Sequence, residues 1–169
     1  AAGSEGYKRQ KQPFIWMPTE MHQVVYEASA YNDEAANRVN VCFAVTDVLE
    51  TQLKIYDDLI VKALIKDSPK YFGTVLSETQ IKERYASSIK MSEKGFSNFR
   101  VKMNKSGRGR VQVYDMNREP RPLPESFLSC SLKPRIQLKG LWMMGRDFGP
   151  LWELVAIQVD ERDSNVCPF

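Results

Sequence analysis

Residues 135–159 have the sequence RIQLKGLWMMGRDFGPLWELVAIQV, and this stretch decides the fold. Residues 135–144 and 151–159 form two runs that are typical of β-strands, because polar and apolar side chains alternate at residues 135–139 and the remainder is mainly apolar. The glycines of residues 145–149 provide a turn between the two runs, and Gly140 predicts a bulge or kink within the first run. The stretch therefore predicts a long β-hairpin.

A pair of alternating runs lies before this stretch in the chain. Residues 99–103 (FRVKM) and residues 110–114 (RVQVY) flank a basic loop that contains glycine. Two alternating runs around such a loop predict another β-hairpin. Arg100 and Lys102 share one face of the first run, and Tyr114 shares its face of the second run with Arg110. This hairpin is therefore expected to have an apolar face and a basic face that carries an aromatic ring.

Two helices are predicted before the hairpins. Apolar residues at three- and four-residue spacing, with Thr46 or Asp47 as the cap, predict a helix over about residues 46–67. The capping-box pattern that begins at Ser77 predicts a second helix over about residues 78–89.

Short strands are also predicted near the beginning of the chain, at residues 14–17, 24–26 and 38–43. Runs of strands with separate helices are typical of a mixed α+β or mainly β domain, or of a small barrel with inserted helices, rather than of alternating βαβ units. The expected organisation is a flexible leader at residues 1–12, a single domain over residues 13–160 and an acidic tail at residues 161–169.

Positive charge is concentrated in the middle of the chain. The net charge is only +3, but residues 82–146 carry 15 basic and 5 acidic side chains, and the segments before and after them have net charges of −3 and −4. Such a block is a common electrostatic footprint of a polyanionic partner, although a solvated basic surface would give the same count.

The remaining composition excludes several kinds of site. Three scattered cysteines and one histidine, His22, argue against a disulfide framework, a zinc site and a histidine-based catalytic triad. No run approaches the roughly 18 apolar residues that span a membrane. We therefore expect an intracellular protein with no cofactor, no metal and no membrane contact.

Basic and aromatic side chains alternate on the predicted strands. Single-stranded nucleic acid is bound by this mixture, because cations contact phosphates and aromatic rings stack on exposed bases. The candidate nucleic-acid-binding residues are Lys90, Arg100, Lys102, Arg108, Arg110, Tyr114, Arg135, Lys139 and Trp142. The alternative for each aromatic ring is the hydrophobic core, which suits Phe99, Trp142, Phe148 and Trp152 better when each is considered alone. Tyr114 suits either role.

Other motifs are less specific. Residues 107–110, GRGR, lie between strands and lack the form of a phosphate-binding P-loop, which favours a flexible turn. Residues 137–139, with Asp115 upstream, faintly resemble the acid-then-Q-x-K arrangement of metal-dependent nucleases. A single acidic candidate supports this nuclease alternative only thinly. Asp57 and Asp58 are interpreted as solvated helix surface, and no catalytic residue is predicted.

Several blocks carry a family resemblance. In order, they are residues 66–73, 83–85, 88–90, 99–102, 113–115, 135–142, 148–149 and 151–154. The most specific element is G-[LI]-W followed by F-G-x-x-W, which here is Gly140, Leu141 and Trp142 followed by Phe148, Gly149 and Trp152. In these blocks the chain resembles a family of small proteins from nucleocytoplasmic large DNA viruses, single-stranded-DNA-binding proteins of the oligonucleotide/oligosaccharide-binding (OB) type.

The resemblance implies an OB-like small antiparallel β-barrel with two inserted helices. It also implies sequence-nonspecific binding of single-stranded DNA, or of RNA, that protects unwound DNA in viral replication, repair or recombination. The alternative is a virion structural or transcription-associated interaction protein that uses the same barrel on a protein partner. Viral replication or virion proteins are further expected partners, and the expected location is the host cytoplasm or nucleus, or the virion. The oligomeric state is left open.

Overall fold

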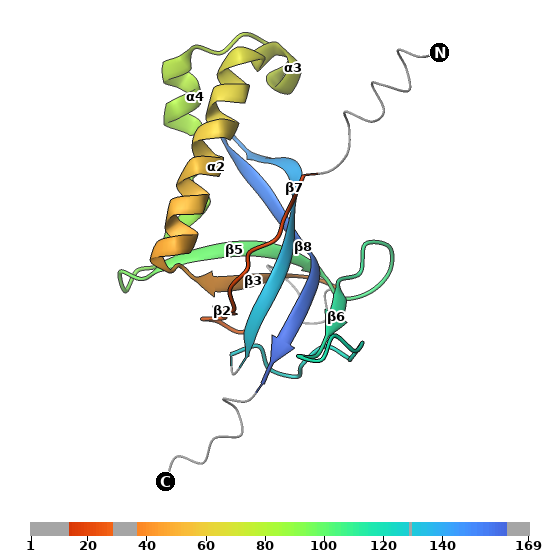
Figure 1. Cartoon of the computed structure of the whole chain (residues 1–169). Helices are drawn as coiled ribbons and strands as arrows, with labels where there is room; N and C mark the ends of the chain where they lie inside the picture. The colour runs from red at the N-terminus through yellow and green to blue at the C-terminus, as the bar shows by residue number, and fades with distance from the viewer. Residues whose placement is uncertain (1–13, 29–36, 129, 162–169) are drawn as a thin grey trace.

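Eight strands form one sheet, and the described helices stand at one end of it (Figure 1). The computed structural model describes residues 14–28, 37–128 and 130–161, so the predicted leader and all of the predicted acidic tail except Glu161 lie outside the described residues. The elements are β1 (Ile15–Trp16), β2 (His22–Gln23), β3 (Arg38–Ala44), α2 (Asp47–Lys66), α3 (Ser68–Phe72), α4 (Glu78–Arg84), β4 (Ile89–Met91), β5 (Ser97–Asn104), β6 (Gln112–Tyr114), β7 (Ser131–Met144) and β8 (Asp147–Asp160).

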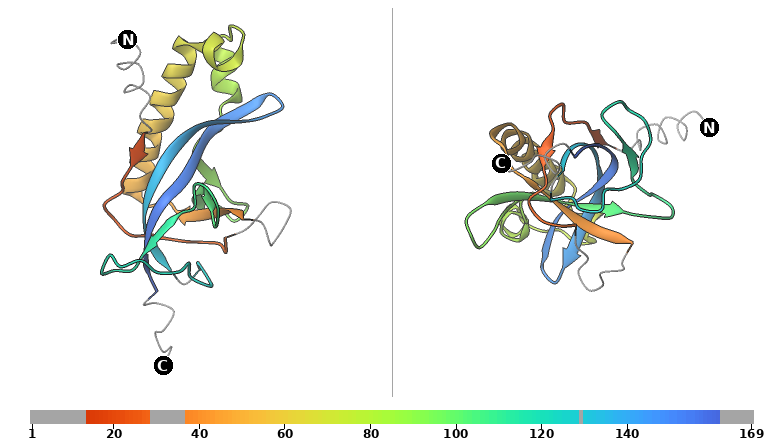
Figure 2. Two further views of the ribbon diagram at one scale, coloured as in Figure 1. Left: turned by 90° about the vertical axis from the view of Figure 1, so that its right-hand side faces the viewer. Right: turned by 90° about the horizontal axis from the view of Figure 1, so that it is seen from below.

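β7 and β8 form the long antiparallel hairpin that the sequence predicts. Their register shifts between Leu138 and Gly140, where Lys139 is the extra residue, and again between Arg135 and Ile136. Gly140 has a φ of +147°, which a residue with a side chain rarely adopts, and the predicted bulge is confirmed. Figure 2 shows the hairpin curving away from the rest of the sheet to lie beside the helices.

The second predicted hairpin is wrong. Within the described residues β6 forms no ladder with β5 and instead pairs in parallel with β8. β5 also pairs with β8 in parallel, so β5 and β6 run in the same direction although only a loop separates them in the chain. Gly107 and Gly109 in this loop have φ values of +75° and +83°, and the loop returns the chain to its original direction instead of reversing it.

The sheet has the strand order β1-β7-β8-β5-β3, with β2 on β7, β4 on β5 and β6 on β8. Over the described residues it does not close, so the predicted closed barrel is wrong. Among the described residues, the two edges of the sheet meet at a single point. There Val24, which follows β2, forms one bridge to Phe43 of β3. A two-residue strand supplies too few backbone groups to complete a ladder. The fold is mostly β, with three described helices.

The first predicted helix is confirmed as α2. The Thr46 hydroxyl oxygen accepts a hydrogen bond from the Leu49 N–H at 3.2 Å and caps the helix. The prediction missed α3, which follows directly with Pro69 in its first turn, where a missing N–H costs nothing. α3 ends at Gly73, which has a φ of +70°.

The second predicted helix is correct at its start and too long at its end. Ser77 and Gln80 form the predicted capping box, with hydrogen bonds of 2.9 and 3.1 Å. α4 ends at Arg84, before the predicted boundary, because the next turn is bonded to the hairpin instead. The Ala86 N–H donates to the Phe148 carbonyl at 2.8 Å, and the chain then enters β4.

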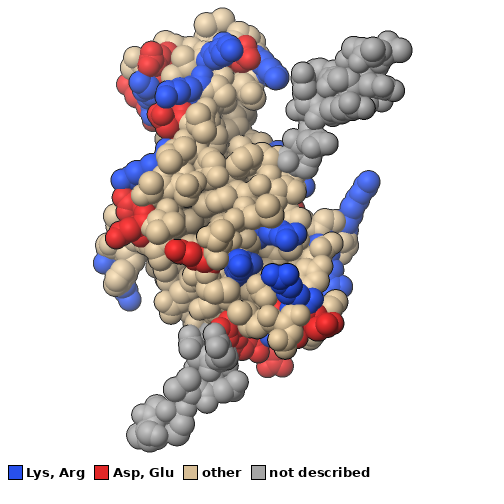
Figure 3. Space-filling view, in the orientation of Figure 1, with Lys and Arg blue, Asp and Glu red and all other residues tan. Residues whose placement is uncertain are grey.

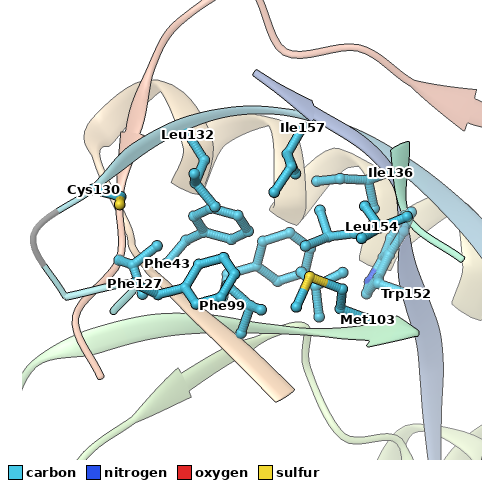
Figure 4. Close-up of a cluster of buried hydrophobic side chains, with 14 of the residues drawn as sticks. Phe43, Phe99, Met103, Phe127, Cys130, Leu132, Ile136, Trp152, Leu154 and Ile157 are labelled. Carbon is cyan, nitrogen blue, oxygen red and sulfur yellow. The ribbon is translucent and has the colours of Figure 1, made fainter. Parts of the chain in front are cut away.

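The main core lies between the strands, and Figure 4 shows Phe43, Phe99, Trp152 and Leu154 pointing into it. The rings of Phe99 and Trp152 meet nearly perpendicularly, with centroids 6.0 Å apart. A smaller cluster of Leu64, Ile81 and Phe148 joins the helices to the hairpin. The core role expected for Phe99, Phe148 and Trp152 is therefore confirmed.

Candidate nucleic-acid interface

A groove of about 470 Å³ lies between the outer face of β5 and the tip of the β7–β8 hairpin. We call it the first groove. Four of the nine predicted contacts line it: Lys90, Arg100, Lys102 and Trp142. The rest of its wall combines small polar side chains, such as Asn40 and Ser88, with the apolar side chains of Met143, Met144 and Leu151.

The alternation of β5 places its basic residues in this groove. Phe99, Val101 and Met103 point into the core and are fully buried, so Arg100 and Lys102 must point to the opposite face. Their neighbours on that face are residues of β3, since Asn40 pairs with Lys102 and Cys42 with Arg100. Lys90 is added by β4, on the other edge of β5. Three cations from two adjacent strands thus border one groove.

Trp142 forms an aromatic wall of the first groove. Unlike Trp152, it is only half-buried, and it packs against the backbone of its ladder partner Gly149. A Cβ atom built on Gly149 would lie 2.8 Å from Cζ2 and Nε1 of Trp142, so only glycine leaves space for the ring in this position. The Lys90 Nζ lies 5.7 Å from the centroid of the Trp142 ring. An aromatic ring and a cation thus lie together, and this is the combination that sites for single-stranded nucleic acid use.

A hydrogen-bond network centred on Asp57 fixes the floor of the first groove. The Asp57 carboxylate accepts hydrogen bonds from the Tyr85 hydroxyl at 2.6 Å, the Ser87 hydroxyl at 2.9 Å, and the Ser88 hydroxyl and N–H at 2.7 and 3.0 Å. The Ser88 oxygen in turn accepts a bond of 2.9 Å from Nε1 of Trp152. Asp57 is therefore a structural residue, and its interpretation as solvated helix surface is wrong.

The electrostatic environment of the first groove favours an anion. Burial and the charge of Arg100 lower the pKa of Lys90 below its ordinary value, against the opposing effect of Asp57. Burial and the charges of Arg38 and Arg100 lower the pKa of Lys102. Among the described residues that line the groove there is no carboxylate to relieve this repulsion. A bound phosphate would relieve it.

A carboxylate does lie close by, but it is already engaged. Glu153 is the ladder partner of Lys102 and is buried. Its oxygens accept hydrogen bonds from Nη1 of Arg38 at 3.2 Å and from Nδ2 of Asn104 at 2.9 Å. Arg38 thus offsets the negative charge that Glu153 would otherwise direct at the groove.

Two further predicted contacts, Tyr114 and Arg135, lie in a separate groove of about 570 Å³. This second groove crosses β6, β8 and β7, and Arg118 and Lys133 also line it. Figure 3 shows Lys and Arg side chains gathered over this region, on the face that Figure 1 turns to the viewer. The separation of Tyr114 from Arg100 and Lys102 follows from the pairing of β6 with β8 instead of β5.

The other three predicted contacts line neither groove. Arg108 and Arg110 are exposed on the loop between β5 and β6, and Lys139 is exposed at the bulge of β7. The nuclease arrangement is not formed, because Asp115 bonds backbone N–H groups of its own turn. Asp115 lies beside Gln158, which pairs with Lys133 on β7. Lys133 is six residues, or about 20 Å, from Lys139 along the strand.

Four residues of the two grooves were missed. Lys133 alternates with Arg135 along β7, so the period of two could have indicated it. Arg118 lies in a turn between strands, and its position depends on contacts that no local pattern predicts. Met143 and Met144 line the first groove with exposed fractions of 57% and 73%, and only the structure shows that they are exposed.

Two findings concern other classes of site. Within the described part of the chain, no group of three or more His, Cys, Asp or Glu residues is placed to hold a metal ion. Among the described helices, none is long and apolar enough to cross a membrane.

Solved structures of phage single-stranded DNA-binding proteins share this fold. The gp2.5 protein of bacteriophage T7 aligns with a TM-score of 0.57 and 11% sequence identity, over 93% of this chain and 97% of that chain. The single-stranded DNA-binding protein of bacteriophage Enc34, in complex with single-stranded DNA, aligns with a TM-score of 0.53 and 10% identity, over 86% of this chain and 84% of that chain. Both neighbours are OB-fold-like.

A search of curated proteins finds no match to this sequence. A family model does match, and it covers residues 30–168, which is most of the chain. The chain therefore belongs to the family of unknown function DUF5871.

Proposed function

We propose that this protein binds single-stranded DNA without strong sequence preference, and that the strand lies in the first groove. The observation that carries the proposal is the convergence of Lys90, Arg100 and Lys102 with the half-buried ring of Trp142. Cations that track phosphates and a ring that stacks on a base recognise features common to every nucleotide. The likeness in fold to phage single-stranded DNA-binding proteins supports the same function.

In this proposal each part of the groove has its own role. Arg100 and Lys102 contact phosphates along the outer face of β5, and Lys90 contacts a phosphate next to the stacked base. Trp142 stacks on that base, while Met143 and Met144 at the rim contact its neighbours. The apolar rim excludes a rigid duplex in favour of unstacked bases, because only an unpaired strand presents base faces to a protein side chain.

The biological setting of the proposal rests on the resemblance to proteins of large DNA viruses. We propose that the protein protects unwound DNA during viral replication, repair or recombination, in the host cytoplasm or nucleus. Viral replication proteins are the proposed partners in that role.

Fluorescence anisotropy with labelled oligo(dT) and a duplex of equal length tests the proposal. We expect clear preference for the single strand and an affinity that falls with salt. Each lost phosphate contact should lower the slope of log affinity against log salt by about 0.7, so the double variant Arg100→Gln/Lys102→Gln should lower it by about 1.4. The matched control is Lys66→Gln, which removes an exposed cation at the end of α2 and should change the slope little.

Three results would contradict the proposal. Equal affinity for duplex and single strand would reduce it to a generic basic surface. An unchanged salt slope in the double variant would remove β5 from the binding site. Absence of binding at low salt would instead favour the alternative, in which the same face binds a protein partner.

A further inference from the structure

The second groove has the composition of a nucleic-acid site in its own right. Arg118, Lys133 and Arg135 line it, and no carboxylate does so among the described residues. None of these three side chains forms an ion pair with another described residue, so their charges are available to a ligand. The Tyr114 ring and the apolar surface of Pro134 complete the wall.

The strand register explains why these groups lie together. β8 pairs with β6 on one side and β7 on the other, so residues form rows across three strands. One row is Tyr114, Gln158 and Lys133, and the next is Gln112, Ala156 and Arg135. The two rows are two residues apart on each strand, so the side chains of both rows lie on the same face of the sheet. The small Ala156 side chain in the middle of its row leaves the hollow between larger neighbours.

The position of Arg118 is fixed by an unusual backbone conformation. Arg118 has a φ of +65°, and among the described residues no other non-glycine residue has a positive φ. The turn that imposes it is held by Asp115, which accepts hydrogen bonds from the Asn117 and Glu119 N–H groups at 2.8 and 3.0 Å. Gln158 of β8 donates to the Asp115 carbonyl at 3.2 Å and so ties this turn to the groove floor. A strained residue persists where its surroundings determine it, and such residues concentrate at binding sites.

A single strand can reach both grooves. Leu151 lines the first groove and Ala156 the second, and the five residue-to-residue steps from one to the other along β8 span about 17 Å. Between the grooves lies Glu153, whose negative charge is balanced by Arg38. Single-strand binding sites on OB folds extend over about 4–16 nucleotides, and one continuous strand of that length fits the distance.

We infer that the second groove binds a second segment of the single-stranded nucleic acid whose first segment lies in the first groove. Lys133 and Arg135, on one face of β7, contact separate phosphates, Arg118 contacts another from the opposite rim, and Tyr114 stacks on a base. The inference rests on the proposed function for the class of ligand, but its residues and its location are independent of the first groove.

Anisotropy with a length series of labelled oligo(dT) gives the first test. The second-groove variant is Arg118→Gln/Lys133→Gln/Arg135→Gln, and its matched control is Arg100→Gln/Lys102→Gln in the first groove. In the wild type, affinity should rise steeply once the strand is long enough to reach both grooves. The second-groove variant should lose this rise with strand length and lower the long-strand salt slope by about 2. Wild-type affinity and slope for long strands in this variant would overturn the inference.

Amide chemical shifts with short oligo(dT) separate this inference from the proposed function. We expect two perturbed regions, around residues 100–102 and around residues 133–135 and 156–158. The second region should still respond in the Arg100→Gln/Lys102→Gln variant. Shifts confined to the first region would overturn the inference and leave the proposed function intact. Shifts confined to the second region would refute the first groove as the site and overturn the inference of one strand shared by both grooves, and shifts in neither region would overturn both proposals.

Discussion

The substitution Gly149→Ala tests the Trp142 ring as a base-stacking surface without removing the ring. The new Cβ would lie 2.8 Å from Cζ2 and Nε1 of Trp142, whereas ordinary contacts are 3.4–4 Å. The ring must therefore move by about 0.6–1.2 Å, because the backbone of β8 is held in its ladder by β7. Gly149 does not have a positive φ, so the backbone itself accepts alanine without strain.

The expected effect on binding follows from the free energy that one stacked base contributes. Stacking on an aromatic side chain contributes about 1–3 kcal/mol per base, which corresponds to about 5- to 150-fold in affinity. Gly149→Ala should remove part of this stacking free energy, and Trp142→Ala should remove most of it. Neither substitution changes a charge, so the salt slope should stay at its wild-type value. Replacing glycine by alanine also restricts the unfolded chain, so we expect little loss of stability from Gly149→Ala.

Anisotropy with oligo(dT) at several salt concentrations measures both quantities, and a double-mutant cycle supplies the control. If the added methyl group acts through the ring, Gly149→Ala should have no further effect on affinity in the Trp142→Ala background. An equal loss in that background would show that the methyl group acts by another route. Wild-type affinity in Trp142→Ala would refute the stacking role itself.

Four further outcomes are expected. Lys102→Met should raise Tm while weakening DNA binding, because it removes a cation whose pKa is lowered by burial and by neighbouring arginines; a fall in Tm would contradict this. Burial lowers the pKa of both Lys90 and Lys102, so the affinity for DNA should begin to decline with rising pH below pH 10.5. In that pH range DNA binding should take up protons, which calorimetry in two buffers measures. Burial also lowers the pKa of His22 below 6.5, so the unfolded state takes up a proton first and Tm should fall as pH drops below about 6.5; His22→Gln should flatten that fall. Asp57→Asn should lower the free energy of unfolding by about 2 kcal/mol or more, measured by urea titration, because an amide cannot replace all the accepting positions of the carboxylate.

Local patterns predicted the elements of this fold better than their pairing. The β7–β8 hairpin is formed by neighbouring segments, so two mainly apolar runs, the turn residues between them and Gly140 were sufficient to predict both strands and the bulge. Alternation along β5 also gave the correct outer face for Arg100 and Lys102. The same alternation is present in β6, but it says nothing about which strand lies alongside. The partner of β6 is β8, about 40 residues away, and only tertiary structure determines that choice.

This pairing error changed the predicted site. A β5–β6 hairpin would have placed Tyr114 beside Arg100 and Lys102 in one basic face. The observed pairing with β8 moves Tyr114 to Lys133 and Arg135, so the nine predicted contacts divide between two grooves and the surface outside them. The role of Asp57 was missed for a similar reason, since its hydrogen-bond partners are 28–31 residues away along the chain.

A bulge in β8 makes two outer grooves compatible with one core. Before Val155, the side chains that join the main hydrophobic core are those of Trp152 and Leu154, at even positions, whereas after it they are those of Ile157 and Val159, at odd positions. Val155 is the extra residue, because Ile136 pairs with Leu154 while Arg135 pairs with Ala156. A regular strand would turn Ala156 toward the core and Ile157 toward solvent. With the bulge, both halves of β8 bury their large apolar side chains, and the outer face keeps Ala156 in line with Arg135. The bulge therefore allows the outer face of β8 to form the second groove while the large apolar side chains stay in the core.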